Sequence, residues 1–194
     1  MNADRRERLR DAAIEVLAEA GGRGLTHRAV DTAAEVPSGT TKNYFPTREA
    51  LLRTAAERCL EQYRTLTEQA ASGPGPRDRD GLATVFRTLL ENVAGPGRGR
   101  LLAYLELQAE SARRPWLAET LDPIGACDFA GFELLQRAAG LPVTPERNAA
   151  VTLALHAAIP HLLSGGPATL AAAGLDDLDR FVRDLLDAVY PRSP

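Results

Sequence analysis

The chain has 194 residues, of which 44% are apolar and 25% are charged, and its formal net charge is −3. This composition is that of an ordinary globular protein, and the length allows one large domain or two small ones. Because no apolar run reaches the roughly 18 residues of a membrane span and no signal-peptide stretch is present, we expect a cytoplasmic protein with free thiols at Cys59 and Cys127.

Three helices are predicted in the first 45 residues. The first covers residues 4–21, where apolar side chains form one stripe at helical spacing before Gly21 and Gly22. Thr26 is expected to cap a second helix, which must end before Pro37. The third helix, residues 38–45, is short, because Pro46 disfavours helical geometry at the residue before it.

The third helix has an unusually polar sequence, Ser38-Gly39-Thr40-Thr41-Lys42-Asn43-Tyr44. Hydroxyl, amide, ammonium and phenol groups can reach base edges and phosphate oxygens in a DNA major groove. By itself the stretch is equally compatible with a polar surface turn. A longer helix followed by two short ones, joined by about three residues, is however the order of a helix-turn-helix domain. The context therefore favours DNA binding.

Residues 5–58 resemble the DNA-binding domain of the tetracycline repressor (TetR) family. The matching pieces are Leu25-Thr26-His27-Arg28-Ala29-Val30, Ala33-Ala34, Val36, Gly39-Thr40, Tyr44-Phe45-Pro46 and Arg48-Glu49-Ala50-Leu51. Two departures matter. Glu35 stands where the family usually has Gly, and a residue with a side chain disfavours a positive φ there. Lys42 stands where the family often has an aromatic residue, which alters the chemistry that faces the groove.

The residues expected to bind DNA lie at the start of the second helix, along the third helix and at the start of the fourth. Central positions of the third helix are expected to reach base edges, with Gly39 allowing close approach of the backbone. The resemblance implies phosphate contacts at Thr26, Tyr44 and Arg48. The full set is Thr26, His27, Arg28, Ser38, Gly39, Thr40, Thr41, Lys42, Asn43, Tyr44 and Arg48. Arg5, Arg6, Arg8 and Arg10 either add phosphate or minor-groove contacts or form a solvated helix end.

A Gly- and Pro-rich segment, residues 72–76, predicts the boundary between two domains. Residues 1–70 are assigned to an N-terminal three-helix helix-turn-helix DNA-binding domain with a connecting fourth helix, capped by Thr47. Residues 71–194 are assigned to an all-helical ligand-binding and dimerisation domain. Five helices are predicted in this domain. The first carries the apolar stripe Leu82–Val93, the second runs from Leu101 to about Ala112, and the third runs from Pro115 to about Ala139 with a kink or break at Pro123. The fourth starts at Pro145, and the last runs from about Leu175 to Tyr190.

Two features of the second domain suggest its functions. Residues 149–163 are apolar on nearly all sides of a helix, so we expect them to pair with the last helix in a four-helix dimer interface that a Leu155→Glu substitution disrupts. The resemblance also implies a pocket for an apolar or amphipathic small-molecule inducer. Core packing explains most aromatic residues, but the candidate ligand-binding residues are Phe86, Tyr104, Gln108, Trp116, Asp128, Phe132 and His156.

Catalytic and metal-binding alternatives have weak support in the sequence. His156 and His161 lie about 140° apart around one helix, so they do not share a metal in the manner of residues four apart. No metal, other cofactor or enzyme activity is expected, because no Ser/His/acid order stands out.

We therefore predict an all-α, homodimeric transcriptional regulator of the TetR type. Its expected partners are a double-stranded, pseudo-palindromic DNA operator and a small-molecule inducer that releases it, with repression as the expected action. One alternative is a helical small-molecule-binding or catalytic protein whose N-terminal helices only pack. An activator is a second alternative, because the sign of regulation depends on where the operator lies relative to the promoter.

Overall fold

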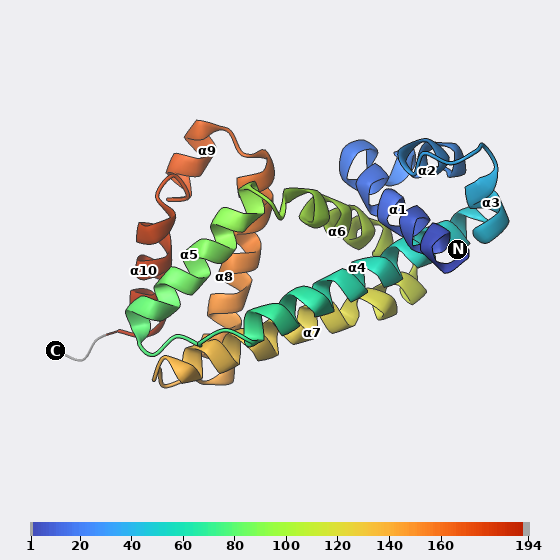
Figure 1. Ribbon diagram of the computed structural model, residues 1–194. Coiled ribbons are helices and arrows are strands. Elements are labelled where there is room, and N and C mark those ends of the chain that lie inside the picture. Colours follow the sequence, from blue (N-terminus) through green and yellow to red (C-terminus); the bar gives the residue numbers. More distant parts are fainter. Residues whose placement is uncertain (1, 192–194) are drawn as a thin grey trace. The chain divides into compact units, whose positions relative to one another are not determined.

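The computed structural model describes residues 2–191, which form ten helices and no β-strand (Figure 1). The predicted all-α class is therefore confirmed. The helices divide into two compact units. Of the described residues, unit 1 comprises 2–70 and 99–124, and unit 2 comprises 71–98 and 125–191. Within the described part of the chain, no helix combines the length and apolarity needed to cross a membrane.

Unit 1 begins with α1 (Asn2–Gly24), α2 (His27–Ala33), α3 (Thr40–Tyr44) and α4 (Arg48–Ala71). The predicted stop at Gly21 is a break inside α1, where φ is 67° and ψ is −178°. Two predicted helix caps are confirmed. The Oγ1 atom of Thr26 accepts a hydrogen bond of 3.1 Å from the amide of Ala29, and that of Thr47 accepts one of 3.0 Å from the amide of Ala50.

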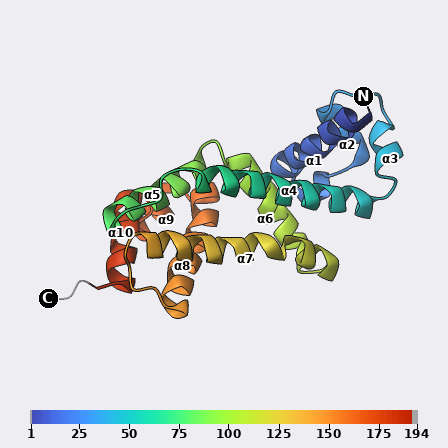
Figure 2. The ribbon, with the colours of Figure 1, turned by 60° about the horizontal axis from the view of Figure 1, so that its bottom comes forward.

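The apolar stripes of these helices form the core of unit 1. Leu9 and Leu17 of α1, Val30 of α2 and Leu51 of α4 are fully buried, and Phe45 closes the core after α3. Figure 2 shows α1 and α2 side by side with α3 beyond α2. Burial of each large apolar side chain contributes about 1.5–3 kcal/mol, so this core holds α2 and α3, which have seven and five residues and are too short to be stable alone.

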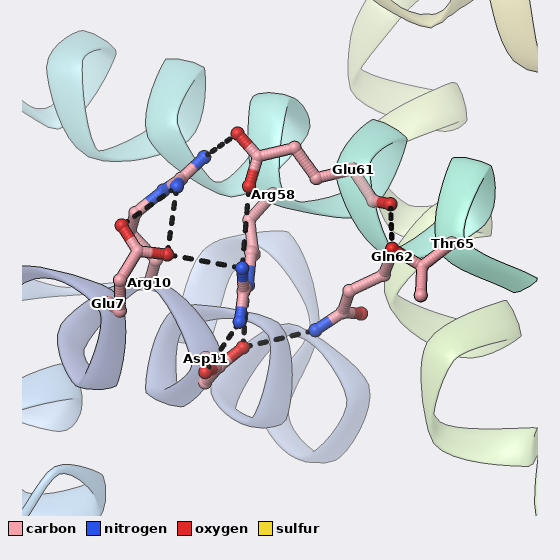
Figure 3. A network of polar contacts seen from close by, with 7 residues as sticks. All are labelled: Glu7, Arg10, Asp11, Arg58, Glu61, Gln62 and Thr65. Atoms are coloured by element: carbon pink, nitrogen blue, oxygen red, sulfur yellow. Dashed lines mark hydrogen bonds and ion pairs between the residues drawn. The ribbon is translucent and has the colours of Figure 1, made fainter. Parts of the chain in front are cut away.

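A network of charged side chains also joins α1 to α4 (Figure 3). Arg10, only 8% exposed, donates to Glu61 at 2.7 Å and to both carboxylate oxygens of Glu7 at 3.0 Å. Arg58 donates to the two oxygens of Asp11 at 2.7 and 2.9 Å. Planar guanidinium groups suit such two-pronged contacts with carboxylates. Arg10 is thus engaged within the domain, which fits neither of the two alternatives that the sequence left open for the arginines of this segment.

Residues 99–124 pack in unit 1, whereas the sequence assigned them to the second domain. They comprise most of α6 (Arg98–Ser111) and the first part of α7 (Pro115–Ala138). Leu107 and Leu117 are fully buried in the same core as α1 and α4. The break in α1 leaves the amide of Gly22 without a partner in the helix, and Glu106 of α6 accepts its hydrogen bond at 2.7 Å. A linear boundary at residue 70 does not describe this packing.

Of the kink or break predicted at Pro123, the break does not occur, because α7 continues through this residue. Proline removes one helical hydrogen bond, the one to the carbonyl of Glu119. Leu121 and Ile124 on either side are buried in the core of unit 1. Their burial outweighs the loss of a single hydrogen bond.

Unit 2 contains α5 (Arg79–Ala94), the rest of α7, α8 (Pro145–Ser164), α9 (Pro167–Ala172) and α10 (Leu178–Val189). Its core joins α5, α8 and α10 around residues such as Phe86, Leu155 and Leu186. The short helix α9 was not predicted, and α10 begins three residues later than expected. Both differences arise in a segment where glycine and proline obscured the helical period.

A buried polar network holds α7, α8 and the end of α10 together. Gln136, fully buried, donates to the Asn148 side chain at 2.8 Å and to the carbonyl of Phe132 at 2.9 Å. It accepts a hydrogen bond of 2.7 Å from the hydroxyl of Tyr190. Asn148 in turn donates to the carbonyl of Phe129 at 2.9 Å. Because buried amides need partners, this set of contacts favours one register of the three helices.

Candidate nucleic-acid interface

The turn between α2 and α3 has an unusual backbone. Glu35 has a φ of 52°, and it is the one residue other than glycine with a positive φ in the described range. This confirms that the turn uses the left-handed conformation at the position where Glu replaces the usual Gly. Gly39, which precedes α3, has a φ of 88° and has nothing near the position of a Cβ atom. The turn thus requires glycine-like freedom twice within five residues.

The carboxylate of Asp31 lies beneath this turn. Asp31 is 3% exposed and accepts hydrogen bonds from the amide of Gly39 at 2.7 Å, the amide of Thr41 at 2.7 Å and the hydroxyl of Thr41 at 2.5 Å. Burial by itself would raise the pKa of Asp31, but these hydrogen bonds stabilise the charged form more and lower the pKa below its usual value. The carboxylate is therefore ionised at neutral pH.

The prediction that Thr41 reads base edges is wrong. Thr41 is completely buried, and its hydroxyl is used by Asp31. Asp31 itself was missed by the sequence analysis, although a signal was present. It follows Val30 directly and precedes Ala34 by three residues, so it shares the buried face of α2. A charged residue in such a position requires specific partners.

The remaining residues of α3 and the segment before it give an exposed polar face. Ser38, Lys42 and Asn43 are exposed, whereas Thr40 and Tyr44 are partly buried. The hydroxyl of Thr40 donates to the carbonyl of Pro37 at 2.5 Å, so its hydrogen is already used. Lys42 and Asn43 consequently supply the main donors that α3 presents to solvent.

The predicted residues outside α3 divide into two groups. Thr26 and Arg28 are exposed at the start of α2, where they are accessible to a phosphate backbone. His27 and Arg48 have partners inside the domain. The His27 Nε2 atom lies 2.6 Å from the carbonyl oxygen of Phe45, and Arg48 donates to the carbonyl oxygens of Gly22 and Leu25 at 2.5 Å each. These two side chains stabilise the domain, a role that the sequence analysis did not predict.

The surface beside α1 has the wrong charge for DNA. An open groove of about 550 Å³ lies between the first half of α1 and residues 33–35. Its charged lining residues are Asp4, Glu7, Arg8, Asp11, Glu15 and Glu35. Five carboxylates against one guanidinium disfavour a phosphate backbone, so the α3 face is the better candidate.

The candidate ligand-binding residues divide between the two units. In unit 2 the Nε2 atom of His156 lies 3.0 Å from the Oδ2 atom of Asp128, and the rings of Phe86 and Phe132 have centroids 5.4 Å apart. The ring of Phe132 also lies 6.3 Å from that of His156. These four residues form a cluster of aromatic rings with one carboxylate and one imidazole.

The other three candidates belong to unit 1. Gln108 donates to the hydroxyl of Tyr104 at 3.3 Å, and the guanidinium of Arg53 lies 4.2 Å from the ring centroid of Trp116. Tyr104 and Trp116 pack against the core of unit 1, whereas Phe86 and Phe132 are buried in the core of unit 2. The four predicted aromatic residues therefore divide between two cores, and their grouping around one pocket stays a prediction. Within residues 2–191 no three His, Cys, Asp or Glu side chains gather as metal ligands.

Comparisons with known proteins agree with this arrangement. The family described as "Tetracyclin repressor-like, C-terminal domain" matches residues 77–188, more than half of the chain. An uncharacterized HTH-type transcriptional regulator in the dhlA 5′ region of Xanthobacter autotrophicus is 36% identical over 91 residues, which cover 47% of this chain and 44% of that protein. The match thus spans less than half of that relative.

Several solved structures resemble nearly the whole chain. A member of the TetR family from Streptomyces coelicolor A3 is 28% identical with a TM-score of 0.67, covering 97% of this chain and 99% of that one. The multidrug binding protein EbrR complexed with ethidium is also 28% identical, with a TM-score of 0.66 and the same coverage. With the helix-turn-helix geometry and the match over residues 77–188, the chain belongs to the tetracycline repressor (TetR) family of transcriptional regulators.

Proposed function

We propose that this chain is a homodimeric repressor that binds a pseudo-palindromic operator and leaves it when a small-molecule inducer binds. The exposed face of α3, with Lys42 and Asn43, carries the proposal. A dimer would place two copies of α3 in successive major grooves, roughly 34–36 Å apart. The inducer would act by binding more tightly to a state that fits the operator poorly. Such a regulator works in the cytoplasm, where its DNA is accessible.

Lys42 is the residue that we assign to base recognition. Its ammonium group can donate to the O6 and N7 atoms of guanine, or it can neutralise a phosphate. The two roles predict different behaviour for Lys42→Ala. Loss of a base contact reduces affinity by about 1–3 kcal/mol and relaxes the preference at one base pair in each half-site. Loss of a phosphate contact weakens binding to all sequences and lowers the salt slope by about one per subunit.

The test is fluorescence anisotropy with labelled DNA from upstream of the chain's own gene, at several salt concentrations. We expect Lys42→Ala to lose affinity for the operator with a nearly unchanged salt slope. Arg137→Ala is a matched control, because it removes one exposed cation from α7, far along the sequence from α3. If wild type and Lys42→Ala bind equally at every salt concentration, α3 does not lie in the groove as proposed.

We place the inducer site in unit 2, near Asp128, Phe132 and His156. A partly buried carboxylate beside aromatic rings suits a planar or amphipathic cation, since ring faces and a negative charge both attract it. The similarity to EbrR, crystallised with ethidium, supports this class of ligand. Ethidium is therefore the first probe, and Asp128→Asn is expected to weaken its binding. Release of operator DNA by ethidium would link the site to regulation.

The dimer interface is proposed on α8 and α10. Along α8 the exposed residues Ala150, Leu153, Ala157 and Pro160 form an apolar stripe. On α10 the half-buried apolar residues are Leu178, Phe181, Leu185 and Val189. Leu155, which the sequence analysis placed in the interface, is instead fully buried within unit 2. Leu153, 57% exposed, is the large apolar side chain of this stripe that is available to a second copy.

A further inference from the structure

The recognition helix α3 is too short to hold its own conformation. It has five residues, and an isolated helix of this length is unstable in water. Its N-cap residue is Gly39, which has no side chain to accept the free amides at the start of the helix. Lys42 and Asn43 can recognise DNA only if some other part of the chain fixes the direction of α3.

Two residues of α2 hold the two ends of α3. At the start of α3, the buried carboxylate of Asp31 accepts three hydrogen bonds of 2.5–2.7 Å from Gly39 and Thr41. At the end, His27 lies 2.6 Å from the carbonyl oxygen of Phe45, the residue that follows α3. His27 and Asp31 are four residues apart and therefore lie on one face of α2.

The contacts at Asp31 are of the strong kind. Each joins a negative charge to an N–H or O–H donor, and charge-assisted hydrogen bonds are shorter and about twice as strong as neutral ones. Thr41 and Asp31 are both buried, so water cannot replace a lost contact. A buried amide or hydroxyl left without a partner destabilises the local structure more than the net value of one hydrogen bond.

We infer that Asp31 and His27 are positioning residues for DNA recognition, which act by clamping α3 between them on α2. Neither side chain needs to touch DNA. The negative charge of Asp31 would repel phosphates, so a direct contact with the backbone contradicts its chemistry. The clamp instead directs Lys42 and Asn43 away from the core. This inference rests on the proposed DNA-binding function, but the clamp itself can be measured without DNA.

The first experiment uses nuclear magnetic resonance on the full-length protein without DNA. In wild type we expect the amide protons of Gly39 and Thr41 to lie at low field, because both donate to a carboxylate. In Asp31→Asn both signals should shift upfield, while amides of α5 and α10 remain unchanged. If these two amide signals are the same in wild type and Asp31→Asn, the clamp does not exist in solution.

The second experiment measures binding to the operator and to unrelated DNA. We expect Asp31→Asn to lose about tenfold or more in operator affinity, in line with a lost charge-assisted hydrogen bond, and to lose less on unrelated DNA. Thr41→Val should behave in the same way, whereas Thr41→Ser, which keeps the hydroxyl, should restore binding. Thr32→Val is the matched control, since Thr32 is exposed on α2 and its hydroxyl bonds only within that helix.

The outcomes separate the clamp from the proposed function. Operator affinity and selectivity equal to wild type in both Asp31→Asn and Thr41→Val would overturn the inference. If Asp31→Asn does not fold, the comparison of Thr41→Val with Thr41→Ser decides the question. If the wild-type protein binds no operator, the proposed function fails, but the clamp can still be judged by magnetic resonance. Amide signals of Gly39 and Thr41 that are the same in wild type and Asp31→Asn would then overturn the clamp as well. At the other end of α3, His27→Gln keeps a hydrogen-bond donor and should therefore bind the operator more tightly than His27→Ala.

Discussion

Replacement of Leu153 by Glu should separate the proposed dimer. The side chain of Leu153 is 57% exposed within one chain. Full burial of a leucine is worth about 1.5–3 kcal/mol, so covering this exposed part contributes about 1–1.5 kcal/mol per chain. A two-fold interface uses the residue twice, which gives about 2–3 kcal/mol for the dimer. A glutamate at this position removes the burial contribution of both leucines and places two charges without partners in an apolar interface.

The expected result is a dimer dissociation constant at least about 100-fold higher than in wild type, because 1.4 kcal/mol corresponds to a factor of ten. Sedimentation equilibrium over a range of protein concentrations measures this constant. Thr88→Glu, at an exposed position of α5, is the matched control for an added charge and should leave the dimer intact. Operator binding should fall together with dimerisation, since two copies of α3 are needed for a palindrome.

Two results would refute the reasoning. A Leu153→Glu protein that sediments as wild type does would show that this stripe of α8 is not the interface. Leu134 on α7 is 68% exposed and offers the contrasting site. If Leu134→Glu separates the dimer and Leu153→Glu does not, the interface lies on α7.

Two further predictions concern stability. Glu35→Gly should raise the free energy of unfolding by about 0.5–1 kcal/mol. The substitution relieves a left-handed backbone strain of about 1–2 kcal/mol, but it also adds backbone freedom to the unfolded chain. Urea denaturation measures this difference, and an equal gain in Glu35→Ala would contradict the explanation. The hydrogen bond from Arg10 lowers the pKa of Glu61, so the charged form stabilises the folded chain above the unfolded pKa of about 4.3, and this contribution is lost as pH falls through the folded value. The difference in stability between wild type and Glu61→Gln should therefore be largest near neutral pH and shrink below pH of about 4; a difference that stays constant with pH would refute it.

The sequence determined the features that depend on a few neighbouring residues. The caps at Thr26 and Thr47 bond to amides three residues later, so they follow from residue type and local spacing. The positive φ at Glu35 was implied by the resemblance, because Glu35 stands where the family usually has Gly. The order of a long helix and two short ones was sufficient to predict the helix-turn-helix domain, and the motifs between Leu25 and Leu51 indicated the family.

The directions of individual side chains were decided only by tertiary packing. A helix of five residues makes little more than one turn, so it has no apolar period that distinguishes buried Thr41 from exposed Lys42. In residues 149–163 apolar side chains occur on nearly all sides of the helix, so their spacing does not indicate which side faces the core. Packing against α5 and α10 selected Leu155 for the core and left Leu153 outside.

Long-range polar contacts also required the folded chain. Asp31 and Thr41 are ten residues apart, and Gly22 and Glu106 are 84 apart. Each pair forms because a break or start of a helix leaves a buried amide that needs an acceptor. The sequence identifies where such an amide arises, but any carboxylate brought close by the fold can satisfy it. Which one does so depends on the packing of the helices, and for this reason the clamp on α3 became visible only in three dimensions.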